Sequence, residues 1–145
     1  MLKGIPAVIS PDLLKTLCEM GHGDLLVLGD ANFPAKTCAA QRGAALIRAD
    51  GLGVSVLLDA ILRLLPLDYS EKAVFLMEPD RPIAVPIFKV YEEIVSRYDS
   101  RGGGLFERIE RFSYYDLARQ AACVVQTGET ALYANIILRK GVVEG

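Results

Sequence analysis

The sequence of 145 residues predicts a single α/β domain built on a mostly parallel sheet. Two observations lead to this class. Short, continuous apolar runs, typical of strands buried on both faces, alternate with segments whose apolar residues recur at helical spacing. No repeat, linker or low-complexity tract interrupts the alternation, and the length suits one domain with a sizeable core. We therefore expect helices layered on a sheet.

Four segments have the spacing and end signals of helices. In the first, Ser10 is a suitable N-cap and Pro11 occupies the first helical position. Pro66 is expected to end the second. Ser113 and Asp116 resemble a capping box at the start of the last. The expected helices are residues 10–21, 53–66, 86–98 and 113–122.

Six apolar runs are expected to be strands, and the last two, separated by about one turn, could run antiparallel. They are residues 24–30, 46–50, 73–77, 105–112, 123–129 and 135–142. Residues 32–45 and the glycine-rich residues 100–104 are expected to be loops. The glycine-rich segment has neither the lysine nor the spacing of a phosphate-binding P-loop.

Composition excludes several functional classes. Hydrophobic residues make up 52% and charged residues 23%, and the net charge of −2 comes without a basic run, so a nucleic-acid partner is not indicated. No segment approaches the roughly 20 apolar residues that span a bilayer, and the N-terminus lacks the apolar core of a signal peptide. Cys18, Cys38 and Cys123 form no CxxC motif. We therefore expect a cytoplasmic protein that binds no membrane.

The single histidine, His22, lies between two glycines in the turn from the first helix to the first strand. It could be structural, a metal ligand, or an acid/base group that works with Asp30. The glycines would leave the imidazole uncovered, and imidazole exchanges protons readily near neutral pH. Cys18, four residues earlier, could share a helix face with His22, but one histidine and one cysteine do not make a metal site, so we expect no metal.

Polar residues near the ends of expected strands are candidates for binding. Asp30 follows the first strand, where α/β proteins bind ligands, although aspartate there also suits a turn. The local pattern around Asp68 favours a turn residue. Tyr133 and Asn135, two positions apart before the last strand, are expected to point to one side and could hydrogen-bond a polyhydroxylated ligand.

Arg111 and Tyr115 lie four residues apart across the start of the last helix. Tyr115 is off the apolar stripe of that helix, so it faces solvent or a cleft. A surface ion-pair cluster around these residues is the alternative.

Three ordered motifs, "MGHGD" at 20–24, "DANFP" at 30–34 and "YANIIL" at 133–138, resemble the ribose pyranase and fucose mutarotase family. The similarity continues through "IRADGLGVSVLLDAI" and "IERFSYYDLARQAACVVQTGE" and so covers nearly the whole chain. The "GHGD" motif and Arg111 are typical of the fucose branch, since the ribose branch tends to carry "GHTD" and a histidine at these places.

The resemblance implies an isomerase that exchanges the anomers of free L-fucose without a metal, nucleotide or redox cofactor. It makes His22 the proton donor, with Asp30 orienting the imidazole or binding a sugar hydroxyl. The other sugar-binding positions that it implies are Asp68, Met77, Arg111, Tyr115, Tyr133, Ala134 and Asn135.

The resemblance also implies a three-layer α/β/α fold on a mixed sheet, assembled into a ring, commonly a decamer, with the site near a subunit interface. The expected partners are the free monosaccharide and further copies of the chain. Two alternatives stay open: a monosaccharide-binding protein without turnover, and a pyranase acting on D-ribose or a similar sugar.

Overall fold

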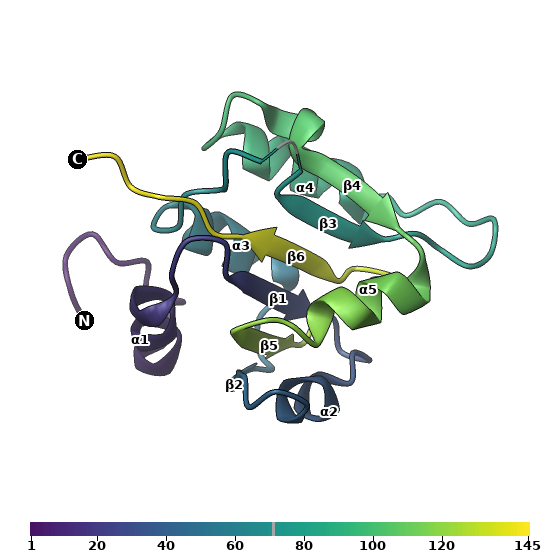
Figure 1. Ribbon diagram of the computed structural model, residues 1–145, viewed down its shortest axis with the longest axis horizontal. Helices are drawn as coiled ribbons and strands as arrows, with labels where there is room; N and C mark the ends of the chain where they lie inside the picture. Colours follow the sequence, from purple (N-terminus) through teal and green to yellow (C-terminus); the bar gives the residue numbers. More distant parts are fainter. Residues whose placement is uncertain (71) are drawn as a thin grey trace.

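The computed structural model describes residues 1–70 and 72–145, and these form a six-stranded sheet with helices on both faces (Figure 1). The strand order is β2-β5-β1-β6-β3-β4. The strands are β1 (Leu25–Gly29), β2 (Ala45–Ala49), β3 (Val74–Met77), β4 (Phe106–Ile109), β5 (Cys123–Thr127) and β6 (Ile136–Arg139). The α-helices are α1 (Pro11–Glu19), α2 (Ala35–Ala40), α3 (Val54–Leu62), α4 (Ile87–Ser96) and α5 (Arg111–Ala118).

The sheet is mixed because β6 runs against its neighbours. Strand β5 is parallel to β1 and β2, and β3 is parallel to β4, whereas β6 lies antiparallel between β1 and β3. Val27 of β1 is opposite Val124 on one side and Ile137 on the other. The last strand is thus antiparallel to β1 and β3, while β5 lies on the far side of β1. This arrangement brings the start of β6 to the edge where β1 and β3 end.

The helices cover the two faces of the sheet in a three-layer arrangement. Helices α1, α3 and α4 pack on the face that includes Leu26 and Leu28, and α2 and α5 pack on the face that includes Leu25 and Val27. In Figure 1, α5 crosses in front of the sheet while α3 and α4 lie behind it. Because β1 is central and covered on both faces, all five of its residues are buried, as its unbroken apolar sequence predicts.

Four local expectations are wrong. Residues 32–45 contain α2, where Ala35, Cys38 and Ala39 pack against the sheet. Within the expected loop 100–104, residues 102–104 belong to a short 3₁₀-helix, Gly102–Leu105. Helix α3 ends at Leu62, four residues before Pro66. Helix α5 begins before the expected capping box, because the Glu110 carboxylate accepts hydrogen bonds from the N–H groups of Phe112 and Ser113 and so acts as its N-cap.

The first helix follows the sequence signals closely. Ser10 caps α1, with its hydroxyl oxygen accepting from the Leu13 N–H at 3.1 Å, and Pro11 is the first helical residue. Within the described residues, every helix is too short or too polar to cross a membrane.

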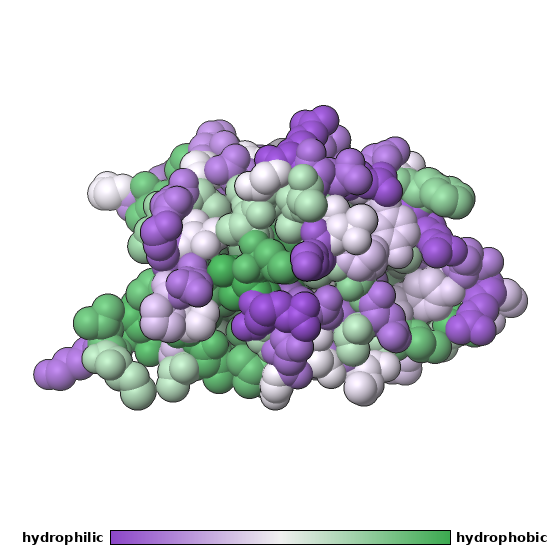
Figure 2. Space-filling view, turned by 90° about the horizontal axis from the view of Figure 1, so that it is seen from below, coloured by the Kyte–Doolittle hydropathy of each residue, from purple (hydrophilic) through white to green (hydrophobic). Residues whose placement is uncertain are grey.

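The surface includes apolar area that this single chain leaves uncovered. Figure 2 shows the molecule from the side of the edge strand β2, with a central apolar area bordered by polar residues. Other exposed apolar side chains lie near the two ends of the strands, including Phe112, Leu132, Tyr69 and Val143.

Candidate active site

A cavity of about 230 Å³ opens at the edge of the sheet where β1 and β3 end and β6 begins. We call this edge the pocket end. The cavity is lined by polar and apolar side chains in similar measure: Asp30, Asn32, Phe33, Met77, Asp80, Arg81, Arg111, Tyr115, Leu132, Tyr133 and Asn135. Six of the residues expected to bind a ligand therefore come together here, from four separate stretches of the chain.

Asp30 is fixed in the pocket by its backbone and its side chain. The residue is 6% exposed, and its N–H donates to Asn135 Oδ1 at 2.7 Å. Its carboxylate accepts from the Asn32 N–H at 2.9 Å, and its carbonyl accepts from Gln126 Nε2 at 2.7 Å. Burial raises the pKa of Asp30, although the N–H groups of Asn32 and Ala134 act in the opposite direction. The carboxylate is held rigidly and is drawn toward its neutral form.

The stretch Tyr133–Asn135 places two side chains at the pocket, those of Tyr133 and Asn135. Ala134, also expected to bind the sugar, is fully buried and is not part of the pocket lining: its carbonyl accepts from the Tyr91 hydroxyl at 2.7 Å, and its N–H acts on the Asp30 carboxylate. Tyr133 has a φ of +55°, in the left-handed region that a tyrosine seldom adopts. The shared orientation of Tyr133 and Asn135 thus comes from a turn before β6 and not from the alternation of an extended strand, which their spacing in the sequence predicts.

Aromatic rings and Met77 form the apolar part of the lining. Tyr115 stacks on Phe33 with ring centroids 5.8 Å apart and an interplanar angle of 22°. The Arg111 guanidinium lies 5.9 Å from the centre of the Tyr115 ring. A Cβ on Gly29 would lie 2.7 Å from Phe33, so the glycine at the end of β1 leaves room for this ring. Together these groups can receive the C–H face of a small ligand beside the polar groups.

Asp80 and Arg81 line the pocket but were not singled out from the sequence. They lie in the loop of residues 78–86 between β3 and α4. The Asp80 carboxylate accepts a hydrogen bond from the Tyr133 hydroxyl, and Arg111 Nη1 lies 3.5 Å from its other oxygen. The rule that selected Asp30, a polar residue just after a strand, would also have selected Asp80.

His22 and Asp68 lie at the opposite edge of the sheet, which we call the histidine end. His22 Nε2 is 2.8 Å from Asp68 Oδ1, and the imidazole side chain is 58% exposed. Asp68 is the better buried of the two: desolvation acts to raise its pKa, but hydrogen bonds from the Ser70 hydroxyl and His22 lower the pKa overall. Within one chain, His22 therefore pairs with Asp68.

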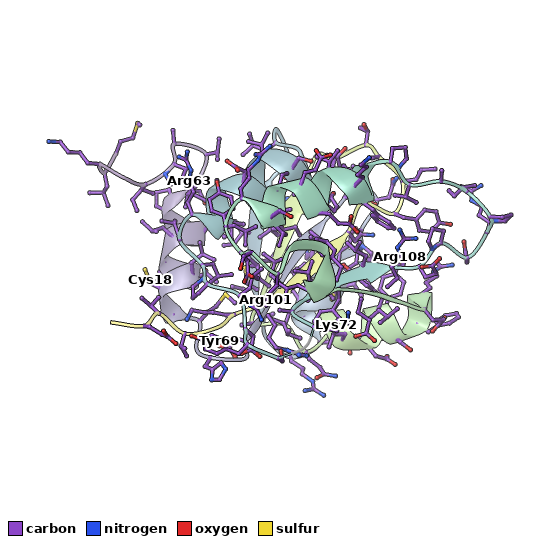
Figure 3. The ribbon with its side chains drawn as sticks, turned by 90° about the horizontal axis from the view of Figure 1, so that it is seen from above. Cys18, Arg63, Tyr69, Lys72, Arg101 and Arg108 are labelled. Atoms are coloured by element: carbon purple, nitrogen blue, oxygen red, sulfur yellow. The ribbon has the colours of Figure 1, made fainter. Side chains whose placement is uncertain are left out.

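The histidine end and the pocket end are separated by the full length of β1. His22 precedes this strand and Asp30 follows it, and five extended residues span about 17 Å at roughly 3.3 Å per residue. In Figure 3, Tyr69, the neighbour of Asp68, lies well apart from Arg108 of β4, which lies toward the pocket end. Asp30 and His22 of the same chain cannot act on one small ligand.

A metal site is not formed by the residues that the structure describes. Among them, no three histidine, cysteine, aspartate or glutamate side chains gather closely enough to hold an ion. What the pocket end offers is hydrogen-bond donors and acceptors beside an aromatic surface, and what the histidine end offers is an exposed imidazole with a carboxylate partner.

Comparison with known proteins identifies relatives that match nearly the whole chain. Human fucose mutarotase is 50% identical over 147 residues, which cover 97% of this chain and 94% of the human protein. The crystal structure of FucU from Bifidobacterium longum superposes with a TM-score of 0.94 at 48% identity, covering 98% of this chain and all of that one.

A third relative contains a ligand. The structure of fucose mutarotase from Streptococcus pneumoniae in complex with L-fucose superposes with a TM-score of 0.90 at 44% identity, covering 99% of this chain and all of the other. The model of the RbsD / FucU transport protein family matches residues 3–143. The resemblance drawn from the three motifs is therefore confirmed, and this chain belongs to the RbsD / FucU transport protein family.

Proposed function

We propose that this protein is an L-fucose mutarotase, an isomerase that interconverts the α and β anomers of free L-fucose. The observation that carries the proposal is the L-fucose complex of the Streptococcus pneumoniae relative, which shares the fold over nearly the full length of both chains. The human relative is also named fucose mutarotase. The pocket end supplies the kind of lining that such a ligand requires.

The pocket suits a 6-deoxy sugar because it combines hydrogen-bonding and apolar surfaces. Arg111 can donate to sugar hydroxyl groups, and Asp30 can accept from them. The Tyr133 hydroxyl donates its hydrogen to Asp80, so its oxygen can accept from a sugar hydroxyl. Phe33 and Tyr115 offer stacked rings against which the C–H groups and the methyl group of L-fucose can pack. This division between polar and apolar groups is common in small-molecule sites.

The reaction needs an acid and a base at one hemiacetal. When the ring opens, the ring oxygen gains a proton and the anomeric hydroxyl loses one, and the free aldehyde then rotates and closes on its other face. We assign His22 as the proton donor to the ring oxygen, since an exposed imidazole can give and take a proton near neutral pH. Asp68 orients the imidazole through its contact with Nε2.

The separation of the two ends leads us to place His22 in the pocket of a neighbouring subunit. Both ends expose apolar side chains that a contact would cover: Phe112 and Leu132 near the pocket end, Tyr69 and Val143 near the histidine end. A head-to-tail contact between unlike surfaces forms a closed ring when its rotation closes. The uncovered apolar area in Figure 2 also favours self-association. We propose a ring, and a decamer as its size, from the resemblance to the family.

The proposal includes no metal or cofactor, because ring opening needs only proton transfer. We also propose a cytoplasmic location, where reducing conditions suit a chain with three unpaired cysteines. A mass near ten times 15.8 kDa in sedimentation would support the decamer, and sedimentation as a monomer would overturn the ring.

Exchange NMR of the anomeric protons of L-fucose tests the activity. We expect the protein to accelerate α/β exchange above the rate in buffer, and to exchange the ring forms of D-ribose much more slowly. Binding of L-fucose without faster exchange would identify a binding protein. Faster exchange of D-ribose than of L-fucose would identify a pyranase. Either result would overturn the proposal.

A further inference from the structure

Asp80 holds two of the pocket's hydrogen-bond donors with one carboxylate. The Tyr133 hydroxyl donates to its Oδ1, and Arg111 Nη1 lies 3.5 Å from its Oδ2. These donors come from different elements, since Tyr133 precedes β6 and Arg111 is the first residue of α5. The hydrogen bond from Tyr133 and the charge of Arg111 lower the pKa of Asp80, which therefore stays ionised and a good acceptor at neutral pH.

The same carboxylate fastens a loop beside the pocket. The loop of residues 78–86 projects past the end of β3 (Figure 1), and its residues 81–84 are exposed. At its base the Glu78 N–H donates to the Ile109 carbonyl. Among the described residues, the hydrogen bonds that join side chains of 79–84 to the rest of the chain are those of Asp80.

Both donors need such an anchor. Tyr133 has the left-handed φ of +55°, so its local backbone conformation is unfavourable for a tyrosine and must be held by surrounding contacts. The Arg111 side chain is 49% exposed, and a free arginine side chain would sample many rotamers. A pocket whose donors are already oriented binds its ligand at a lower entropic cost.

We propose that Asp80 is a positioning residue for the sugar, whose carboxylate holds the Tyr133 hydroxyl and the Arg111 guanidinium in their binding orientation and keeps the 78–86 loop beside the pocket. This inference rests on the proposed function. Asp80 acts through these two donors, so it governs how tightly the sugar binds and leaves proton transfer by His22 nearly unchanged.

The test compares Asp80→Asn with Glu78→Gln. Glu78 is a matched control in the same loop: the substitution removes the same charge, and its carboxylate lies 3.9 Å from Arg108, outside the pocket lining. We expect Asp80→Asn to raise the Kd for L-fucose about tenfold, because the neutral amide loses the attraction to the Arg111 guanidinium and the charge that strengthens the hydrogen bond from Tyr133. The anomer exchange rate at saturating L-fucose should change less than about twofold, and Glu78→Gln should match the wild type in both measurements.

A second variant shows whether Asp80 acts through Tyr133. Tyr133→Phe removes the hydroxyl that donates to Asp80, so Asp80→Asn has less left to weaken in that background. The fold-increase in Kd of the double variant Asp80→Asn/Tyr133→Phe should therefore be well below the product of the two single fold-increases. Fully multiplicative effects, or an unchanged Kd in Asp80→Asn, would overturn the role of Asp80. If the wild type itself binds no L-fucose, the proposed function fails, and that outcome is recognised before any variant is measured.

Discussion

The two ends of β1 carry opposite kinds of chemistry. At the pocket end, Asp30 is 6% exposed and is held through its N–H, its carbonyl and its carboxylate. At the histidine end, the His22 side chain is 58% exposed and makes one side-chain hydrogen bond, to Asp68. The first end is a formed cavity whose groups are fixed, and the second is an open surface with one proton-exchanging group.

In the proposed function the two ends of β1 have separate roles, with sugar binding at the pocket end and proton transfer at the histidine end. A small sugar needs many fixed contacts, and the buried, hydrogen-bonded residues at the pocket end supply them. A proton donor must instead project from its own subunit when it serves a pocket elsewhere. In the proposed ring, each interface would join one subunit's pocket end to the next subunit's histidine end, so neither end would be active alone.

Replacing His22 should have the largest effect on this comparison. We expect His22→Ala to reduce the protein's contribution to L-fucose exchange by about 10²–10⁴-fold, the usual value of general acid–base catalysis. The Kd for L-fucose should change far less, because the residues of the pocket end remain. Exchange NMR gives the rate and saturation-transfer titration gives the Kd. Exchange at the wild-type rate in His22→Ala would remove His22 from the mechanism.

Mixing two inactive variants tests whether the ends belong to different subunits. Arg111→Glu places a negative charge beside Asp80 and should abolish sugar binding, while His22→Ala lacks the donor. After random subunit exchange, about a quarter of the interfaces would pair an intact pocket with an intact histidine. Activity should rise to about that share of the wild-type value. If each site lay within one chain, mixing would restore nothing.

The sequence patterns predicted the strands and the pocket end better than the contacts between distant residues. Asp30 and Asn135 could be found because strand ends of a sheet converge on one edge, whatever the details of the loops. Asp80, three residues after β3, could have been selected by the same rule, but its contacts with Tyr133 and Arg111, 53 and 31 residues away, could not have been predicted. No local pattern encodes such a contact.

Local competition explains the remaining misses. The capping box expected at Ser113 was displaced because Glu110 accepts from two N–H groups and starts α5 earlier. The turn pattern around Asp68 gave no indication that this residue pairs with His22, which is 46 residues away in the sequence. The separation of His22 from Asp30 could instead have been predicted, because the strand expected between them places them at its opposite ends.

Gly29→Ala should disturb the pocket end alone. The added Cβ would lie 2.7 Å from Phe33, so Phe33 must shift and its stacking on Tyr115 must change. We expect a loss of about 1–3 kcal/mol in the free energy of unfolding, the usual cost of overpacking, together with weaker L-fucose binding. Gly51→Ala is a suitable control, since a Cβ there meets no atom within 4 Å. Unchanged stability and binding in Gly29→Ala would show that Phe33 is not held against β1.

The smallest expected effect is on the pH dependence of stability, to which Asp68 and Asp30 should contribute with opposite signs. Because the folded pKa of Asp68 is lowered, its ionised form stabilises the fold above the unfolded pKa of about 3.9, and this contribution is lost as the pH falls through the folded pKa. Asp68→Asn should therefore be less stable than the wild type at neutral pH, and the gap should close as the pH falls below about 4.

Asp30 should behave in the opposite way. Since burial raises its folded pKa, the stability that it contributes is fully present below about pH 3.9 and is lost as the pH rises through the folded pKa. Asp30→Asn, whose amide oxygen can still accept from the Asn32 N–H, should thus gain stability relative to the wild type toward neutral pH. Urea unfolding at several pH values and one protein concentration measures both gaps. At neutral pH the difference in free energy of unfolding from the wild type should be negative for Asp68→Asn and positive for Asp30→Asn. Two differences of the same sign would contradict the contrast, in which burial destabilises the ionised Asp30 and hydrogen bonds stabilise the ionised Asp68.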